Sequence, residues 1–393
     1  MPLPFSVYFW TLVAFFFIGL FDSIYLAISH YRVHVDIGYS SFCAVSRSIN
    51  CDTVSQSPYA IFLQLPVSVW GVIGYLFFFL LIPLAMDKSA VKKRLWAFFF
   101  LISFFFCICS IILALISTYY IHSYCIMCVL SYAVNFFLLF YSWIIRKRFS
   151  PEETFFESLK RDFFFLMREK REKTLWLFIP FILVVALTWH VYPKYWNLRP
   201  PLLSKQIARG ITKDLHPWIG AENPELVIHE FSDYQCFQCK KMHFYLRQLI
   251  AEHPDKIRLV HHQYPMDSRF NPIVKKPFHE GSGKLALIAI HGMRKNKFWE
   301  VNDVLFNLDI KNRGGINSKD FKNITGLDNK ELFFVLTSLN NRSNDYINNL
   351  YLILQRDIRE GMKAGVTGTP GYLVNKKLYL GIIPPDVLKD ALE

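Results

Sequence analysis

Long stretches of this chain contain no charged side chain. Five runs share a length of at least 20 residues and hold at most one Asp, Glu, Lys, Arg or His: residues 5–29, 67–86, 95–119, 126–145 and 174–193. Each run meets the length of about 20 residues that a helix needs to cross a bilayer. So many long uncharged runs are rare outside membranes, which disfavours a single water-soluble core. The sequence therefore predicts five membrane-spanning helices.

Basic residues are also missing from residues 1–10, although the whole chain has a formal net charge of +13. A secretory signal peptide starts with a basic region, so the first apolar run is expected to be a retained helix. No basic stripe interleaved with aromatic side chains occurs in residues 199–393. We therefore expect no nucleic-acid partner, and the mild basic excess there suits a surface near anionic lipid.

The distribution of Lys and Arg predicts how the chain is oriented. Residues 87–94 and 146–173 are rich in basic side chains, whereas residues 30–65 hold only two and residues 120–124 hold none. Short loops rich in Lys and Arg stay in the cytoplasm. The loop at residues 30–65 and everything after the fifth helix are then predicted to lie outside.

Six of the eight cysteines form three pairs: Cys43/Cys51, Cys125/Cys128 and Cys236/Cys239. The predicted topology places all three on the outer face of the membrane, where disulfides persist. Three dithiols on one face suggest a relay, in which each step is the attack of a thiolate on a disulfide. The other two cysteines, Cys107 and Cys109, lie within the third apolar run and are expected to be small apolar fillers.

The first pair, Cys43 and Cys51, lies in the loop between the first two apolar runs rather than in a predicted helix. Seven residues separate the two thiols. One interpretation is a structural disulfide that closes a small loop. The other is a mobile pair that shuttles electrons, which a flexible loop would permit.

The second pair opens the fourth apolar run, and its two thiols share one helical face. At a helix N-terminus the positive end of the dipole favours the thiolate of Cys125. Tyr132 lies one turn beyond Cys128, where its hydroxyl either contacts a quinone carbonyl or packs against a neighbouring helix. Asp22, near the outer end of the first run, is either a functional intramembrane acid or a side chain that reaches water.

The third pair follows the apolar segment 225–235 and precedes an amphipathic run. Strand, Cys-x-x-Cys and helix in this order open a thioredoxin-like fold. A zinc site at Cys236 and Cys239 could take His243 as a third ligand, but no fourth ligand follows at a suitable spacing. We therefore predict no metal site.

The first part of the chain resembles the vitamin K epoxide reductase family over residues 8–145. An outer-loop cysteine pair, a following Ser-Pro and a Cys-x-x-Cys-x-x-x-Tyr motif carry the resemblance. It implies a four-helix bundle around a quinone, either ubiquinone or menaquinone. Cys128 would then be the thiol closest to the quinone, Cys125 would exchange with the loop, and Cys43 and Cys51 would shuttle electrons to Cys125.

The same resemblance implies two further quinone contacts. Ser57 matches a hydroxyl residue that the family places near the site, and Tyr132 matches its quinone-proximal tyrosine. The second apolar run has no counterpart of the asparagine that animal members use. The choice of quinone is therefore left open by the sequence.

Residues 222–393 resemble the DsbA-like oxidases, which carry a helical insertion in a thioredoxin fold. The helix-rich segment after Cys239 and the later Gly-Thr-Pro at 368–370 carry this resemblance. It implies that Pro370 is a cis-proline that faces the dithiol and receives the chain of a partner protein. A cis bond is accessible almost only before proline.

Glu230 precedes Cys236 by six residues and matches a buried acid of the DsbA-like proteins. The resemblance implies that this acid takes a proton from the resolving thiol of Cys239; the alternative is a solvent-facing glutamate at a sheet edge. The dipeptide Phe237-Gln238 departs from the Pro-His of strong oxidases and the Gly-Pro of thioredoxins.

The predicted architecture is a transmembrane four-helix bundle with a fifth linking helix, followed by an α/β thioredoxin-like domain with a helical insertion. The expected domains are residues 1–145, a link with the fifth helix at 146–199, and the thioredoxin-like domain at 200–393. Electrons are predicted to pass from thiols of secreted substrate proteins through the three cysteine pairs to the quinone pool of a bacterial cytoplasmic membrane. All three cysteine pairs would act at the periplasmic or outer face of this membrane.

Two other functions remain open. A transmembrane importer of reducing power would usually place its cysteines in helices accessible from both faces, which the predicted topology disfavours. A membrane-anchored metallochaperone would need a Met- or His-rich metal motif, and none is present in the sequence.

Overall fold

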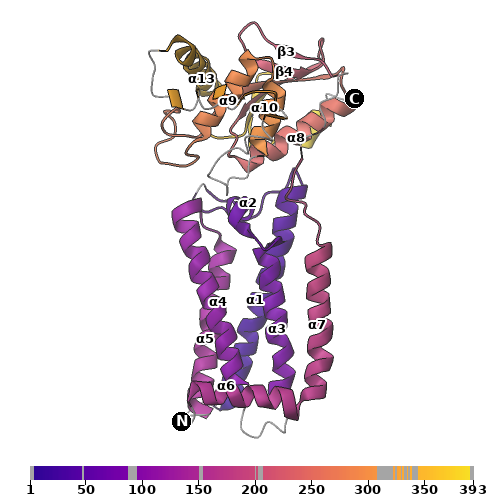
Figure 1. The fold of residues 1–393 in the computed structure, drawn as a ribbon, viewed down its shortest axis with the longest axis vertical. Helices are drawn as coiled ribbons and strands as arrows, with labels where there is room; N and C mark the ends of the chain where they lie inside the picture. The colour runs from indigo at the N-terminus through magenta and orange to yellow at the C-terminus, as the bar shows by residue number, and fades with distance from the viewer. Residues whose placement is uncertain are drawn as a thin grey trace. The chain divides into compact units, whose positions relative to one another are not determined.

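The computed structural model describes residues 4–46, 48–86, 95–149, 154–199, 201, 207–307 and 344–389, with scattered positions between 322 and 338. The chain divides into two compact units, Met1–Tyr195 and Trp196–Glu393 (Figure 1). Each unit is described here by itself. The basic link 87–94 lies outside the described residues.

Five helices of the N-terminal unit are long and apolar enough to cross a membrane, as the uncharged runs predict. They are α1 (Phe5–Val35), α3 (Val67–Ala85), α4 (Trp96–Ile116), α5 (Ile126–Phe149) and α7 (Arg171–Val191). The predicted end of the first helix is wrong, because α1 continues six residues beyond residue 29. Its last turns carry polar side chains, since a helix can extend past the apolar run that starts it.

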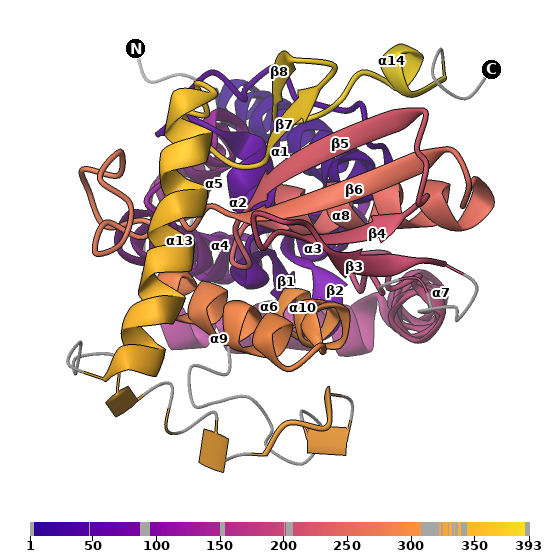
Figure 2. The ribbon, with the colours of Figure 1, turned by 90° about the horizontal axis from the view of Figure 1, so that it is seen from above.

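Helices α1, α3, α4 and α5 pack around a shared aromatic core (Figures 1 and 2). The ring of Phe78 on α3 lies 5.8 Å from that of Phe16 on α1 and 4.7 Å from that of Phe99 on α4. Helix α7 packs outside this bundle against α3, where Phe178 lies 5.3 Å from Phe77. The predicted four-helix bundle with a fifth helix is therefore confirmed.

The charged link after α5 folds into α6 (Phe155–Phe164) and the π-helical turn η3 (Phe165–Glu169). Thr154 and Glu157 form a capping box at the start of α6. The buried carboxylate of Asp162 accepts hydrogen bonds from the backbone amides of Leu95 and Ala97, at 2.9 and 3.0 Å. Asp162 thus accepts hydrogen bonds from backbone amides at the start of α4, which have no acceptor within that helix.

Short elements connect the long helices near the cysteines. They are α2 (Cys51–Gln56), the 3₁₀ turn η1 (Pro58–Ala60), the hairpin of β1 (Ile61–Phe62) and β2 (Leu65–Pro66), and the π-helical turn η2 (Ser117–Ile121) that extends α4. Pro66 directly precedes α3. Proline at this place costs no hydrogen bond, because the first amides of a helix lack partners.

The C-terminal unit contains a six-stranded sheet in the order β3-β4-β6-β5-β7-β8. Its strands are β3 (Arg209–Ile211), β4 (Pro217–Gly220), β5 (Leu226–Ser232), β6 (Ile257–Gln263), β7 (Gly371–Val374) and β8 (Lys377–Leu380). Strands β5 and β6 are parallel and the other neighbours antiparallel. Its described helices are α8 (Phe237–Glu252), α9 (Ser282–Arg294), α10 (Phe298–Phe306), α13 (Asp345–Lys363) and α14 (Pro385–Lys389). Helices α9 and α10 belong to the predicted helical insertion.

Candidate active site: three cysteine pairs

Cys43 and Cys51 form a disulfide, with their Cα atoms 5.6 Å apart. The prediction that this pair lies in a flexible loop is wrong for Cys51, which is the first residue of helix α2. Asn50 caps that helix, because its side-chain oxygen accepts a hydrogen bond from the amide of Thr53 at 3.0 Å. The second thiol of the loop is thus held at a helix N-terminus.

A short bridge ties this loop to the segment before α5. The amide of Asn50 donates to the carbonyl of Tyr124 at 2.9 Å, and the amide of Tyr124 donates to the carbonyl of Ser48 at 2.8 Å. Residues 49 and 124 pair as an isolated parallel β-bridge. Cys51 and Cys125 follow the bridge directly in sequence, so the backbone places them side by side.

Cys43, Cys51 and Cys125 form one buried cluster, and Cys128 packs against it together with Leu26, Val54 and Met127. The exposed fractions of Cys43, Cys51 and Cys125 are only 0–4%. The structure therefore brings the first two cysteine pairs together in an apolar setting closed to bulk water.

Cys125 and Cys128 are free thiols at the start of α5. The sulfur of Cys125 accepts a hydrogen bond from the backbone amide of Cys128 at 3.2 Å. Cys125 is buried whereas Cys128 is half-buried. The two thiols thus have different neighbours: Cys125 contacts the loop pair and Cys128 lies at the rim of the cluster.

The two residues expected near a quinone lie around these thiols. Ser57 donates its hydroxyl to the carbonyl of Val54 at 2.7 Å, and Val54 itself packs against the cysteine cluster. Tyr132 follows Cys128 by four residues on α5, so it lies one turn further along the same helix face. The quinone contacts expected of Ser57 and Tyr132 stay predictions.

Asp22 is a residue whose surroundings the sequence left undecided. It is buried in the bundle, and its Oδ2 accepts a hydrogen bond from the hydroxyl of Ser131 on α5. Ser131 follows Cys128 by three residues, so it lies one turn further along the same helix face. The other carboxyl oxygen, Oδ1, has no hydrogen-bond partner among the described residues.

The third pair sits at the start of α8. Cys236 is the N-cap of this helix, and its sulfur accepts a hydrogen bond from the amide of Cys239 at 3.2 Å. Cys236 is 9% exposed and Cys239 is fully buried. The thiol of Cys236 also lies 3.6 Å from the carbonyl of Thr369, whose bond to Pro370 is cis. The Pro370 loop therefore faces the more accessible sulfur.

His279 is a charged neighbour of Cys236 that sequence reasoning missed. Its Nδ1 lies 3.0 Å from Oδ2 of the buried Asp233. Burial alone would lower the pKa of His279, but the carboxylate of Asp233 outweighs it and raises that pKa. No local signal in the sequence indicated this contact, because His279 follows Cys236 by more than forty residues, which include α8 and β6.

The pKa of the Cys236 thiol reflects these neighbours. Burial alone would raise it, but the hydrogen bond with Cys239 and the positive charge of His279 together bring it below the ordinary value. Burial and the adjacent thiolate raise the pKa of Cys239 well above that value. The pair is thus arranged with one nucleophilic thiolate and one protonated thiol, which suits thiol–disulfide exchange.

Glu230 on β5 is fully buried, which excludes the solvent-facing alternative. Its Oε2 lies 2.6 Å from Nδ1 of His243 on α8 and 3.1 Å from Nδ1 of His261 on β6. Burial alone would raise the pKa of Glu230, yet the charge and hydrogen bond of His243, with His261, lower it to about 2. His243 therefore faces Glu230.

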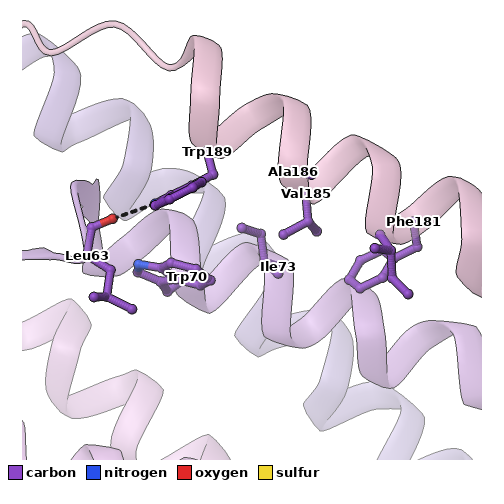
Figure 3. A pocket seen from close by; sticks show the side chains of 8 residues that line it. Leu63, Trp70, Ile73, Phe181, Val185, Ala186 and Trp189 are labelled. Atoms are coloured by element: carbon purple, nitrogen blue, oxygen red, sulfur yellow. Dashed lines mark hydrogen bonds between the residues drawn. The ribbon is translucent and has the colours of Figure 1, made fainter.

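An apolar groove runs between α3 and α7 in the N-terminal unit, with a volume of about 320 Å³ (Figure 3). Its lining includes Trp70 and Trp189, whose indole N–H groups donate to the carbonyls of Phe62 and Leu63, both at 2.8 Å. No thiol or titratable side chain lines it. The groove therefore lacks the groups that the relay chemistry needs.

Comparison with known proteins identifies the two units. Residues 10–143 match the vitamin K epoxide reductase family, and residues 212–393 match the thioredoxin family. No curated protein matches the chain.

Several solved structures are similar to less than half of this chain. A thioredoxin-like oxidoreductase from Silicibacter pomeroyi is 21% identical, with 46% of this chain and 91% of that chain covered and a TM-score of 0.35. The thiol-disulfide exchange protein alpha-DsbA2 from Wolbachia pipientis is 22% identical, with 45% and 87% covered and a TM-score of 0.30. BdbD from Bacillus subtilis is 16% identical, with 47% and 95% covered and a TM-score of 0.35.

Apolar helices that carry two clustered cysteine pairs, followed by a thioredoxin fold with a third, define a membrane thiol–disulfide oxidoreductase. Within that class, residues 10–143 of the N-terminal unit are similar to the vitamin K epoxide reductase family, and residues 212–393 are similar to the thioredoxin family.

Proposed function

We propose that this protein forms disulfides in substrate proteins and passes the electrons to a membrane quinone. The order is substrate thiols, Cys236/Cys239, Cys43/Cys51, Cys125/Cys128 and then quinone. The observation that carries this proposal is the single buried cluster of Cys43, Cys51 and Cys125, against which Cys128 packs. Two cysteine pairs in contact can exchange a disulfide without any large movement.

Each step balances as thiol–disulfide exchange. A substrate thiolate attacks the Cys236–Cys239 disulfide and forms a mixed disulfide. A second thiol of the substrate then attacks the substrate sulfur of that mixed disulfide, which leaves Cys236 and Cys239 reduced. The Cys236 thiolate then attacks the Cys43–Cys51 disulfide, and Cys239 resolves the adduct. The reduced loop pair transfers its two electrons and two protons to a Cys125–Cys128 disulfide in the same way.

The N-terminal unit fits a quinone acceptor of the ubiquinone or menaquinone class. Tyr132 lies one turn beyond Cys128 on α5. Ser57 bonds to Val54, which packs against the cysteine cluster, and one carboxyl oxygen of the buried Asp22 has no partner among the described residues. A quinone would take up the two electrons and two protons that leave the reduced Cys125/Cys128 pair. Cys128, at the rim of the cluster, would face it, with Ser57 and Tyr132 as polar contacts.

The C-terminal unit would act on secreted proteins that carry free thiols. Cys236 is the attacking and attacked sulfur because it is the more exposed of the pair and its pKa is lowered. The Pro370 loop would hold the partner chain beside Cys236. The two histidines bonded to Glu230, rather than its carboxylate, whose pKa is lowered to about 2, would pass on the proton that leaves Cys239 when the disulfide forms.

We further propose that the chain is a multi-pass protein of a bacterial cytoplasmic membrane, with its cysteine pairs toward the periplasm or exterior. The basic end of α5, residues 146–148, would face the cytoplasm. The opposite end of α5 starts beside Cys125, so the dithiols would face away from the cytoplasm.

The proposal is tested with the full-length protein in detergent under anaerobic conditions. Purified protein is mixed with a reduced dithiol peptide and a soluble ubiquinone or menaquinone analogue, and quinol formation is followed by absorbance. We expect one quinol for each peptide disulfide. The double variant Cys236→Ala/Cys239→Ala should lose peptide-driven turnover while a small dithiol still reduces quinone through the loop pair. Peptide oxidation without quinol would overturn quinone as the acceptor.

A further inference from the structure

A second group of histidines lies in the C-terminal unit, away from the cysteines. His216 directly precedes β4, His262 lies on β6 and Glu360 lies on α13. We call these three residues the Glu360 cluster. Their ligand atoms all lie within 4.8 Å of one another. His262 is next to His261 on β6, so its side chain points to the face of the sheet opposite to the Glu230 site.

Two distances within the Glu360 cluster lie at, or about 0.2 Å below, the short end of the ligand spacing in a tetrahedral metal site. Oε2 of Glu360 lies 3.1 Å from Nε2 of His216 and 3.3 Å from Nδ1 of His262. Zinc binds such nitrogen and oxygen atoms at about 2.0–2.2 Å, which sets neighbouring ligand atoms roughly 3.3–3.6 Å apart in a tetrahedron. The buried Nδ1 of His262 makes no hydrogen bond within the part of the chain that the structure describes.

The outer nitrogens of both histidines already have partners that would orient them toward a metal. Nδ1 of His216 lies 3.5 Å from Oδ1 of the buried Asp357, whose Oδ2 accepts a hydrogen bond from the amide of Gln263 at 3.0 Å. Nε2 of His262 lies 2.9 Å from Nδ1 of His229 on β5. Metal-binding histidines usually have such a partner on the second ring nitrogen, which fixes the tautomer and the ring plane.

Access and charge also suit a cation. The side chain of Glu360 is 37% exposed, whereas those of His216 and His262 are 7% and 4% exposed. Arg356 lies 3.7 Å from the other carboxyl oxygen of Glu360, Oε1, so it leaves Oε2 directed at the imidazoles. The carboxylate of Glu360 therefore faces both imidazoles, while the guanidinium of Arg356 lies 3.5 Å from the other ring nitrogen of His216, Nδ1.

The Glu230 site is less suited to a metal ion than the Glu360 cluster. Its three residues also gather within ligand range, but all of them are buried. The 2.6 Å contact between Glu230 and His243 is a short hydrogen bond rather than the edge of a coordination tetrahedron. None of the three side chains of the Glu230 site is exposed, whereas Glu360 is partly exposed. The two clusters therefore differ in solvent access as well as in the spacing of their atoms.

We propose that the Glu360 cluster binds a divalent transition-metal ion of the zinc type through two histidine nitrogens and one carboxylate oxygen. A water molecule would complete the tetrahedron. The ion would join β4, β6 and α13, three segments that are distant in sequence. Because α13 ends at Lys363, shortly before the Pro370 loop, the metal would stabilise the helix that leads into that loop.

The test uses the full-length protein in detergent, stripped of metal by a chelator, with its cysteines oxidised so that no thiolate can bind the ion. Co²⁺ is titrated first, and then Zn²⁺. We expect one Co²⁺ per chain, with the visible bands of a tetrahedral nitrogen and oxygen site and no thiolate charge-transfer band, and displacement by Zn²⁺. Zn²⁺ should also raise the unfolding temperature of this unit.

Four variants locate the site. Glu360→Gln and His262→Gln should each weaken Co²⁺ binding at least about tenfold. His291→Gln, at another buried histidine of this unit, should leave binding unchanged. Since Glu360 is partly exposed, Glu360→Gln should fold even if His262→Gln does not. Absence of binding, full affinity in Glu360→Gln, or loss of binding in His243→Gln would each overturn the proposal.

Discussion

The backbone amide of Asn50 donates a hydrogen bond to the carbonyl of Tyr124 across 2.9 Å. Each of these residues is followed directly by a cysteine of a different pair. This backbone contact joins the segments that carry Cys51 and Cys125, and both cysteines belong to one buried cluster with Cys43. We propose that Cys51 exchanges with Cys125 and Cys43 with the thioredoxin dithiol.

This tether predicts which loop cysteine exchanges with α5. In a Cys43→Ser/Cys128→Ser variant, Cys51 and Cys125 should form a disulfide on mild oxidation, because the bridge holds them together. The matched Cys51→Ser/Cys128→Ser variant leaves Cys43 with Cys125 and should give less of that product. Digestion without reductant and mass spectrometry of the joined peptides measures both. Equal yields would contradict the assignment.

The thioredoxin step can be trapped by removing the resolving thiol. In Cys239→Ser, Cys236 should form a lasting mixed disulfide with Cys43, since no neighbouring thiol can release it. The same peptide mapping identifies the product. A link from Cys236 to Cys125, with no loop adduct under any condition, would remove the shuttle role from Cys43 and Cys51.

The quinone step should depend on Cys128 and Tyr132 to different degrees. Cys128→Ala should abolish quinol formation, because it removes the thiol that closes the disulfide with Cys125. Tyr132→Phe should slow it by a smaller factor, because only the hydroxyl is lost. Anaerobic absorbance measures the quinol, and single-turnover oxidation of peptide by Cys236/Cys239 should stay normal in both. Normal quinol turnover in Cys128→Ala would show that its assigned role is wrong.

Asp22 should act in the same step. Asp22→Asn keeps the shape of the side chain but removes its acid–base chemistry, and we expect quinol formation to fall about a hundredfold, as for loss of a proton-transferring group. Ser142→Ala, at a buried residue of α5 rather than α1, is the control and should keep full activity. Unchanged turnover in Asp22→Asn would leave Asp22 with a packing role only.

The reactivity of Cys236 should shift with pH. A group with a lowered pKa is ionised over a wider range, so the reduced wild-type protein should react with iodoacetamide with a midpoint below the ordinary thiol value of 9.0. His279→Gln removes a positive charge beside the thiolate, and the midpoint should rise. His291→Gln should leave it unchanged. A midpoint that stays the same in His279→Gln would contradict the electrostatic role of His279.

The sequence by itself determined the features that repeat locally along the chain. Uncharged runs of 20 or more residues fixed five helices, because burying charge in a bilayer is costly. A Cys-x-x-Cys at a helix start places two thiols on one face whatever the rest of the fold does. Both dithiols accordingly show the same 3.2 Å contact between the first sulfur and the second amide. The predicted end of α1 was wrong because no local sequence signal stops the helix at residue 29.

Only the tertiary structure decided which distant residues meet. The contacts of Asn50 with Tyr124, Asp22 with Ser131, and Glu360 with two histidines all join separate elements. Likewise, His279 reaches Asp233, next to the Cys236 segment, from the helical insertion. Periodicity and spacing predict which face of an element a side chain occupies, but they do not determine what packs against that face. The neighbours that tune each thiol and gather the Glu360 cluster are set by packing between elements, because packing alone joins segments that are far apart along the chain.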